Sequence, residues 1–360
     1  MRIGLIADAV DEPGGIGRYT RELLAGLART GDVSLVVCSP NAGLSTVARL
    51  AGDRLDAHLP MPEDSVAGGL WVRHLSGRQL ASQKVAVVHA TKHLVPRTPL
   101  PTVLTVHDVL TITRRRENPI LKRILLPRQY MRSMHGADLL VAVSGATRDR
   151  LLALEQTWAS KTTVIPEGAS RALFEASPIE IPNLGDFALA VGDVIPRKNL
   201  NVLIDVWPEV VERGGPHLLV IGALGPRGND IGAALEDLEE RHLATWIRGT
   251  DDGRLRWSYE HARVVLLPSF EEGFGLPLVE ARAFGAAVIA STDRALVEVA
   301  GGDLNVIHIS PSDRNAWRDA VIATSPRVHS AIVEPSPDLY SWDRHAATVV
   351  QAYRDLASIL

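Results

Sequence analysis

The chain has 360 residues, of which 46% are hydrophobic and 22% are charged, and its formal net charge at pH 7 is −4. This length is too great for one ordinary hydrophobic core and fits two domains of roughly 170 residues each. The composition excludes a disordered or fibrous protein. No stretch approaches the roughly 20 apolar residues of a membrane span, and the apolar run at the N-terminus is too short for a signal peptide. The sequence therefore predicts a cytoplasmic protein, in which the single cysteine, Cys38, is a core residue.

Charge is distributed unevenly between the two halves. Residues 1–180 carry 22 Lys and Arg against 17 Asp and Glu, whereas residues 181–360 carry 16 against 25. A positive half is typical of a domain that faces an anionic partner. The stretch 114–132 mixes seven cations with apolar residues, so it is the candidate for peripheral contact with the inner face of a membrane. The alternative is a solvated helix packed on a sheet. No nucleic-acid partner is expected.

Short apolar runs, rich in β-branched residues, alternate with longer amphipathic segments. They lie at Arg2–Ala7, Ser34–Cys38, Val85–His89, Thr102–His107, Asp138–Val143, Phe187–Val191, His217–Ile221, Ala262–Leu267, Ala286–Ala290 and Val306–Ile309. Such runs are typical of buried parallel strands, and their alternation with helical patterns predicts βαβ units. We therefore expect an α/β protein with two Rossmann-like domains, each a doubly wound parallel sheet, facing each other across a cleft.

Segment 165–185 concentrates proline, glycine and polar residues without a period, which is typical of a linker. We place an N-terminal domain at residues 1–175 and a C-terminal domain at residues 176–339. Residues 340–360 carry apolar residues at helical spacing. They predict a closing helix that packs back on the N-terminal domain.

The turn at residues 192–199 has the composition of an anion site. An apolar strand ends at Gly192, and a helix begins near Asn199 after a proline and two adjacent cations, Arg197 and Lys198. Backbone N–H groups at a helix start attract phosphate, a glycine permits close approach, and the cations add positive charge. The alternative is a solvated pair of cations. Cations at a helix N-terminus oppose the helix dipole, which favours the phosphate interpretation.

A second strand-to-helix turn combines glycines with two glutamates. Glu272 precedes Gly273-Phe274-Gly275, and Glu280 lies about two helical turns further on. Carboxylates accept hydrogen bonds from the hydroxyls of a sugar or a ribose, and turn amides suit a phosphate. The alternative, surface charge, fits this glycine-rich setting less well.

These turns resemble motifs of glycosyltransferase family 4, which carry Glu-x7-Glu within Pro-Ser-x-x-Glu-Gly-Phe-Gly-Leu-Pro-x-x-Glu-Ala. This sequence has Pro268-Ser-Phe-Glu-Glu-Gly-Phe-Gly-Leu-Pro-Leu-Val-Glu-Ala. The resemblance also covers Pro196-Arg-Lys-Asn, the loop Gly14-Gly15-Ile-Gly17, Val106-His-Asp-Val, Val143-Ser-Gly-Ala-Thr and Ser341-Trp342. It therefore spans nearly the whole chain and implies the two-domain GT-B fold of a retaining hexosyltransferase.

The resemblance also implies roles for individual residues. Arg197 and Lys198 would hold the donor diphosphate, Glu272 the hydroxyls of the transferred sugar, and Glu280 the ribose. The remaining donor contacts would come from Gly15, Gly192, Thr250, Gly273, Phe274, Gly275 and Leu276.

His107 ends an apolar strand at the carboxyl edge, where open α/β sheets bind ligands. Taken alone, such a histidine more often belongs to a capped turn than to a site, but the resemblance implies contact with the sugar. The neighbouring Asp108 would fix the loop or the imidazole. The glycine loop at 14–17 is a weak dinucleotide fingerprint, because its third glycine is missing and the loop before it is long.

Two segments depart from the family pattern and leave the donor base open. Glu167-Gly-Ala-Ser stands where the family often has Asn-Gly-Val-Asp, and Ile247-Arg-Gly-Thr-Asp-Asp replaces the usual base-side loop. The sequence has no Asp-x-Asp motif, so we expect no metal and no cofactor besides the nucleotide-sugar co-substrate.

The favoured donor is GDP-mannose, because the Val106-His-Asp-Val and glycine-loop patterns look like those of bacterial mannosyltransferases of surface-polysaccharide assembly. UDP and dTDP sugars stay open as donors. The acceptor would be a hydroxyl of a glycan, a lipid-linked molecule or a small molecule. The alternative functions are a two-lobed nucleotide-sugar epimerase and a non-catalytic subunit that binds sugar nucleotides.

Overall fold

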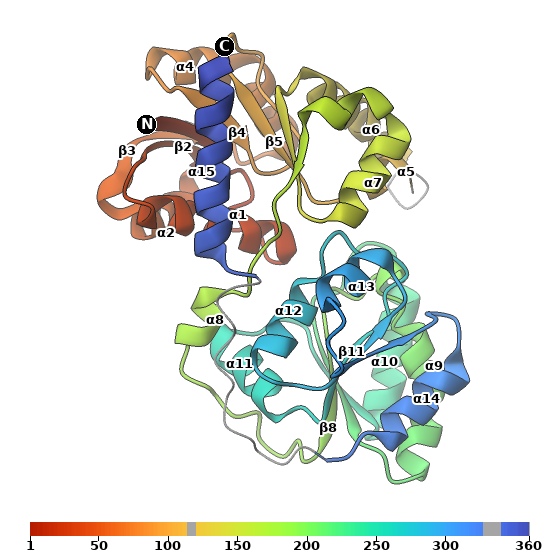
Figure 1. The fold of residues 1–360 in the computed structure, drawn as a ribbon. Helices are drawn as coiled ribbons and strands as arrows, with labels where there is room; N and C mark the ends of the chain where they lie inside the picture. The colour runs from red at the N-terminus through yellow and green to blue at the C-terminus, as the bar shows by residue number, and fades with distance from the viewer. Residues whose placement is uncertain (114–119, 327–339, 360) are drawn as a thin grey trace. The chain divides into compact units, whose positions relative to one another are not determined.

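The computed structural model describes residues 1–113, 120–326 and 340–359. Contacts divide the chain into two compact units, one of Met1–Gly168 with Tyr340–Leu360 and one of Ala169–Leu339 (Figure 1). The first boundary between them, after Gly168, lies within segment 165–185 and a few residues before residue 175, where the sequence places it. We call them unit 1 and unit 2.

Unit 1 is built on a seven-stranded parallel sheet with the order β3-β2-β1-β4-β5-β6-β7. Its strands are β1 (Arg2–Ile6), β2 (Ser34–Pro40), β3 (Leu55–Met61), β4 (Val87–Ala90), β5 (Thr102–Val106), β6 (Leu139–Ala142) and β7 (Thr162–Val164). Its helices are α1 (Gly15–Arg29), α2 (Leu44–Ala51), α3 (Ser65–Trp71), α4 (Gly77–Ser82), α5 (Leu110–Thr113), α6 (Ile120–Gly136), α7 (Gly145–Leu154) and α15 (Trp342–Ile359).

Unit 2 is built on a six-stranded parallel sheet with the order β10-β9-β8-β11-β12-β13. Its strands are β8 (Phe187–Val191), β9 (His217–Ile221), β10 (Ala244–Ile247), β11 (Val264–Leu267), β12 (Val288–Ser291) and β13 (Val306–Ile309). Its helices are α8 (Arg171–Glu175), α9 (Asn201–Glu212), α10 (Asn229–Glu240), α11 (Asp252–His261), α12 (Leu276–Ala283), α13 (Arg294–Ala300) and α14 (Arg314–Ala323).

The two doubly wound sheets confirm the predicted fold class, and each of the ten predicted apolar runs corresponds to a strand. Three strands were missed: β3, β7 and β10. All three are edge strands, which need no continuous apolar run because they lack a neighbour on one side. In β3 this freedom is visible as Asp56 and Pro60 within the strand, residues that argue against a central position.

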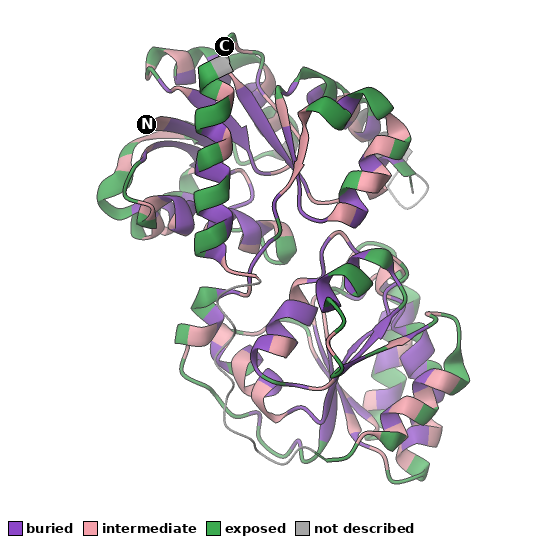
Figure 2. Cartoon of the chain, viewed as in Figure 1, coloured by how far each residue is buried: buried purple, intermediate pink, exposed green. Residues whose placement is uncertain are grey.

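The strands form the buried centre of each unit, as Figure 2 shows by colour. Cys38 on β2 is fully buried, as predicted. In unit 2 the largest buried side chains include Trp207 of α9 and Trp317 of α14, which pack in one cluster with residues of the sheet. A rigid sheet covered by such helices holds the loops at its carboxyl edge in place.

Helix α15 lies against α1 within unit 1 (Figure 1). A Cβ on Gly26 would lie 2.8 Å from Cβ of Ala346, so the helices approach as closely as this glycine allows. Trp342, Val349 and Tyr353 are buried, and Arg29 Nε pairs with Asp343 at 2.7 Å. Burial of several large apolar side chains, each worth about 1.5–3 kcal/mol, makes α15 an integral part of the unit 1 core.

The basic stretch 114–132 falls only partly on described residues. Residues 114–119, with three of its cations, lie outside them, and the rest belongs to α6. Among the helices of the described segments, none is long and apolar enough to cross a membrane.

Candidate active site

The two motif turns lie side by side at the carboxyl edge of the unit 2 sheet, because β8 and β11 are neighbouring parallel strands. The order of the sheet reverses between them: β9 and β10 continue to one side, β12 and β13 to the other. In open α/β sheets, ligands bind at such a switch point. The topology thus brings residues 192–199 and 268–275 to the expected position of a ligand site.

Backbone and side-chain hydrogen bonds join the two turns. Phe270 N donates to Arg197 O at 2.9 Å, and Asn199 Nδ2 donates to Pro268 O at 3.0 Å and to Pro311 O at 2.7 Å. Asn199 has a left-handed backbone with φ 54°, which asparagine tolerates better than most residues. These bonds hold Arg197 and Lys198, in the 3₁₀ turn η6 (Pro196–Lys198), against the second turn.

Four side chains form a charged cluster, which we call the Glu272 cluster: Ser269, Glu272, Arg197 and Lys198. Glu272 Oε2 accepts from Arg197 NH1 at 2.8 Å, and its Oε1 accepts from Lys198 Nζ at 2.8 Å and from Ser269 Oγ at 2.6 Å. The Glu272 side chain is only 7% exposed. Burial alone would raise its pKa, but Lys198 and Arg197 outweigh this effect and lower the pKa to about 2.

Two glycines in the motif turns have backbone conformations and close contacts that exclude a side chain. Gly192 has φ 135°, and a Cβ there would lie 3.0 Å from Lys198 Cε, so a side chain would displace the lysine. Gly275, the N-cap of α12, has φ 106°, and a Cβ would lie 2.6 Å from Leu296 Cδ2. Both positions therefore require glycine. The turn Gly273–Gly275 leads into the N-terminus of α12, whose backbone amides favour an anion.

Glu280 occupies a different environment from Glu272. It lies on α12, is buried, and accepts a hydrogen bond from Tyr259 Oη at 2.8 Å. Tyr259 belongs to α11 and is also buried. The sequence analysis missed Tyr259, since nothing in its local pattern points to a carboxylate 21 residues away.

Thr250 follows β10 in the base-side loop. Its Oγ1 is buried and has no hydrogen-bond partner among the described residues. An unpaired buried hydroxyl costs about 1–3 kcal/mol, so such a group is expected to have a partner in the functional state.

In unit 1, His107 follows β5 at the carboxyl edge and is held from two sides. Its Nε2 lies 2.9 Å from Thr91 O, a carbonyl oxygen that can only accept, so Nε2 carries a proton. Its Nδ1 lies 3.3 Å from Glu167 Oε1, and the Glu167 side chain is 4% exposed. These two contacts fix the orientation of the ring. The neighbouring Asp108 accepts from Leu110 N at 2.9 Å and so fixes the loop.

Behind His107 lies a buried hydrogen-bond network, the Tyr19 network, formed by Tyr19, Thr105, His89, His345 and Tyr353. Tyr19 Oη lies 2.8 Å from Thr105 Oγ1 and 3.2 Å from His345 Nε2, and His89 Nε2 lies 2.8 Å from Thr105 Oγ1. His89 Nδ1 contacts Tyr353 Oη. The Tyr19 ring packs edge-on against His107 at 4.6 Å between centroids. The network thus connects α1, β4, β5 and α15 beneath the candidate sugar contact.

The glycine loop precedes α1 at the switch point of the unit 1 sheet, which lies between β1 and β4. Gly14 has φ 86°, Gly15 is the first residue of α1, and a Cβ on Gly17 would lie 1.9 Å from Glu12 O. The backbone at Glu12 lies so close to residue 17 that only glycine fits there. Gly15 is exposed at the N-terminus of the helix, where backbone N–H groups suit an anion.

Asp8, which the sequence analysis did not select, lies in this loop after β1. Its Oδ1 is buried and has no hydrogen-bond partner among the described residues. Burial raises its pKa to about 6, although Lys92 opposes the shift. A carboxyl with one buried, unpaired oxygen and a raised pKa at a switch point is a functional candidate. In the sequence, Asp8 directly follows an apolar strand, and the same position is what indicates His107 as a candidate.

No group of three or more His, Cys, Asp or Glu side chains within the described ranges is arranged to hold a metal ion.

Comparison with known families gives two matches. A model described as Glycosyltransferase Family 4 matches residues 13–172, and one described as Glycosyl transferases group 1 matches residues 186–325. The first match falls in unit 1 and the start of unit 2. The second contains both motif turns of the candidate site.

Individual proteins are similar over long stretches. The chain is 26% identical over 298 residues to O-antigen chain mannosyltransferase B of Escherichia coli, covering 76% of each chain. The structure superposes on sucrose-phosphate synthase of Thermosynechococcus elongatus with TM-score 0.73 and 18% identity, covering 100% of both chains. It also superposes on HepE of Anabaena in complex with UDP-glucose, with TM-score 0.69 and 16% identity, covering 99% and 100%.

Proposed function

The chain is a glycosyltransferase of family 4 with the GT-B fold, and we propose that it transfers a hexose from a nucleotide-sugar donor to an acceptor hydroxyl with retention at the anomeric carbon. The observation that carries this proposal is the Glu272 cluster at the switch point of unit 2. There a buried carboxylate and two cations lie beside the N-terminus of α12.

In the proposed mechanism, Arg197, Lys198 and the turn amides stabilise the negative charge that grows on the diphosphate as the sugar leaves. Arg197 has five N–H donors and Lys198 three, so each can bond phosphate oxygens as well as Glu272. Glu272 accepts from the hydroxyls of the sugar. The leaving phosphate takes the proton of the acceptor hydroxyl, as the family resemblance implies.

The remaining site residues have supporting roles in this proposal. Glu280 binds the ribose, and His107 contacts the sugar. Thr250, in the base-side loop, contacts the donor. Supporting observations are the buried position of Glu280 and the buried, unpaired Oγ1 of Thr250. Because both ring nitrogens of His107 already contact protein atoms, the orientation of this side chain is fixed before the sugar binds.

We propose GDP-mannose as the donor and a glycan, lipid-linked or small-molecule hydroxyl as the acceptor. The similarity to an O-antigen mannosyltransferase supports mannose. UDP-glucose is the second candidate, because it is bound in the structurally similar HepE. Peripheral attachment to the inner face of a membrane stays a further proposal for the lipid-linked acceptor. The epimerase alternative finds no support among the matches.

The test is a screen of nucleotide sugars with the full chain, in which release of GDP, UDP or dTDP is measured with and without a mixture of acceptor glycans. Acceptor-dependent release from GDP-mannose, with an α-linked product from the α-linked donor, is the expected result. Donor release that no acceptor stimulates would contradict transferase activity. Inversion in the product would contradict retention, and release of only UDP or dTDP would replace the proposed donor.

A further inference from the structure

A cavity of about 640 Å³ opens in unit 1 at the amino edge of the sheet. Thr102, the first residue of β5, lines it, whereas His107 follows the last residue of the same strand. At 3.3 Å per residue, about 16 Å of strand separates the two. The volume lies within the range of ordinary small-ligand sites, about 300–1,000 Å³. The cavity is thus separate from the candidate active site.

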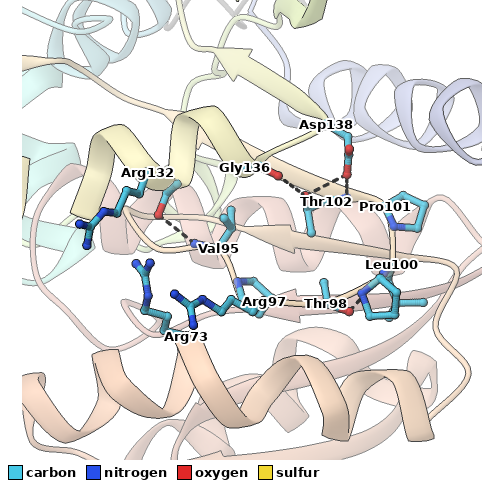
Figure 3. Close-up of a pocket in the computed structure, with 13 residues that line it drawn as sticks. Arg73, Val95, Arg97, Thr98, Leu100, Pro101, Thr102, Arg132, Gly136 and Asp138 are labelled. Carbon is cyan, nitrogen blue, oxygen red and sulfur yellow. Dashed lines mark hydrogen bonds between the residues drawn. The ribbon is translucent and has the colours of Figure 1, made fainter. Parts of the chain in front are cut away.

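Three arginines line this cavity: Arg73, Arg97 and Arg132. Figure 3 shows their guanidinium groups gathered at one end of it. Within the described part of the chain, none of the three pairs with a carboxylate. The one acidic residue in the lining, Asp138, is turned to the start of β5, where its Oδ2 accepts from Thr102 N at 2.8 Å and from Thr102 Oγ1 at 3.0 Å. The positive charge in the cavity is therefore not balanced by the lining.

The arginines are close enough to repel one another. Burial lowers the pKa of Arg73, and the charges of Arg97 and Arg132 lower it further. Arg73 is partly buried, whereas Arg97 and Arg132 are exposed. Like charges gathered at the wall of a cavity are unfavourable in the free protein, and a multivalent anion removes this repulsion.

Backbone contacts hold two of the arginines together before any ligand binds. Arg97 N donates to Arg73 O at 3.1 Å. A Cβ on Gly77, the first residue of α4, would lie 2.3 Å from Arg97 O, so this glycine permits the segment to approach. Arg73 lies in a π-helical turn, η3 (Val72–Ser76), closed by a 2.6 Å bond from Ser76 Oγ to Val72 O. Such turns are frequent at functional sites.

We propose that this cavity binds a phosphate-bearing ligand through Arg73, Arg97 and Arg132, as a second anion site of the enzyme. The planar guanidinium fork matches two oxygens of a phosphate, and several forks can share one phosphate or diphosphate group. The ligand is a free phosphorylated small molecule or a phospholipid headgroup, which share this chemistry. The site is independent of the proposed transferase function, because its residues lie at the opposite edge of the sheet from His107.

The test measures binding of inorganic pyrophosphate to the full chain by calorimetry. It uses an Arg197→Gln/Lys198→Gln background, so that the proposed donor site does not contribute. We expect this background to bind pyrophosphate and the added change Arg73→Gln/Arg97→Gln to weaken binding about tenfold or more, the usual effect of losing charge-assisted hydrogen bonds. Arg97→Gln alone, at an exposed position, should weaken binding without any effect on folding, as checked by circular dichroism.

A matched control removes the same charge elsewhere. Arg78 and Arg128 are exposed and do not line the cavity, so Arg78→Gln/Arg128→Gln should leave the affinity unchanged. Absence of binding in the background, or equal affinity with and without Arg73 and Arg97, would overturn the proposal. Flotation with phosphatidylcholine vesicles, with and without phosphatidic acid, distinguishes the sources. If the cavity variant no longer floats with vesicles that contain phosphatidic acid, the ligand is a phospholipid headgroup. If its flotation is unchanged although pyrophosphate binding is lost, the ligand is a free phosphorylated molecule.

Discussion

The carboxyl edges of the two sheets carry polar clusters of opposite electrical character. In unit 2, Glu272 lies between two cations and is ionised at any ordinary pH, with a pKa of about 2. In unit 1, burial lowers the pKa of His89 to about 3 and that of His345 to about 4, so both rings of the Tyr19 network are neutral at pH 7. The first cluster is suited to a ligand whose charge changes during reaction. The second holds a precise shape without charge, which suits the positioning of neutral hydroxyl groups.

The strongest test of this contrast changes Glu272 to Gln. In the variant an NH2 donor replaces one acceptor oxygen and the negative charge is lost, while both cations stay. We expect kcat to fall by about 10²-fold, equivalent to roughly 3 kcal/mol, while nucleoside diphosphate still binds. Kinetics and calorimetry with the nucleoside diphosphate measure the two effects. Full transfer activity in this variant would remove the charged cluster from the mechanism.

In unit 1, the test changes Asp8, which follows β1 at the carboxyl edge of the sheet, to Asn. This change should affect the stability of the folded state. Burial raises the pKa of Asp8 from 3.8 to about 6, so the folded state binds the proton more tightly than the unfolded state. Stability therefore falls as pH rises from about 4 to about 6, and above this range the ionised group costs up to about 3 kcal/mol. We expect Asp8→Asn to raise the free energy of unfolding at pH 7.5 and to change it little at pH 4.

Urea denaturation of both proteins at the two pH values checks this expectation. Asp53→Asn, at an exposed position, serves as the matched control and should have little effect at either pH. A stability gain for Asp8→Asn that is equal at pH 4 and pH 7.5 would show that the buried charge is not its cause.

Glu280 and Tyr259 sharpen the comparison within unit 2. If Glu280 binds the ribose, Glu280→Gln should weaken nucleoside diphosphate binding by about 1–3 kcal/mol. Tyr259→Phe removes the 2.8 Å hydrogen bond to Glu280 but leaves its carboxylate, so it should weaken binding less. Calorimetry on both variants decides, and equal losses would identify Glu280 as a structural partner of Tyr259.

The smallest expected effect is that of a chelator. If Arg197 and Lys198 supply the positive charge at the diphosphate, donor turnover should be unchanged in excess EDTA. Activity that EDTA abolishes and Mn²⁺ restores would mean that these cations are not sufficient.

The comparison also explains what could be predicted from the sequence. Each of the turns 192–199 and 268–280 is one continuous stretch of sequence, so its glycines, cations or glutamates are visible as a motif. The apolar strand before each turn predicts that the turn lies at the carboxyl edge of the sheet. The direct pairing of Glu272 with Arg197 and Lys198 was not predicted, because it depends on β8 and β11 being neighbours. The Tyr19 network joins residues up to 326 positions apart, and no local pattern encodes such a contact.

The division of unit 1 along the chain has a consequence for synthesis on the ribosome. Unit 2 is one continuous segment and can fold as soon as it emerges, whereas the α1 surface that packs on α15 stays uncovered until residues 342–359 have been made. Until then Tyr19 lacks His345 and His89 lacks Tyr353. Nascent chains with exposed apolar surface are prone to misassociate. The core of unit 1 is therefore completed only after unit 2 has been made, and a ribosome stalled before residue 342 would hold a nascent chain with unit 1 incomplete.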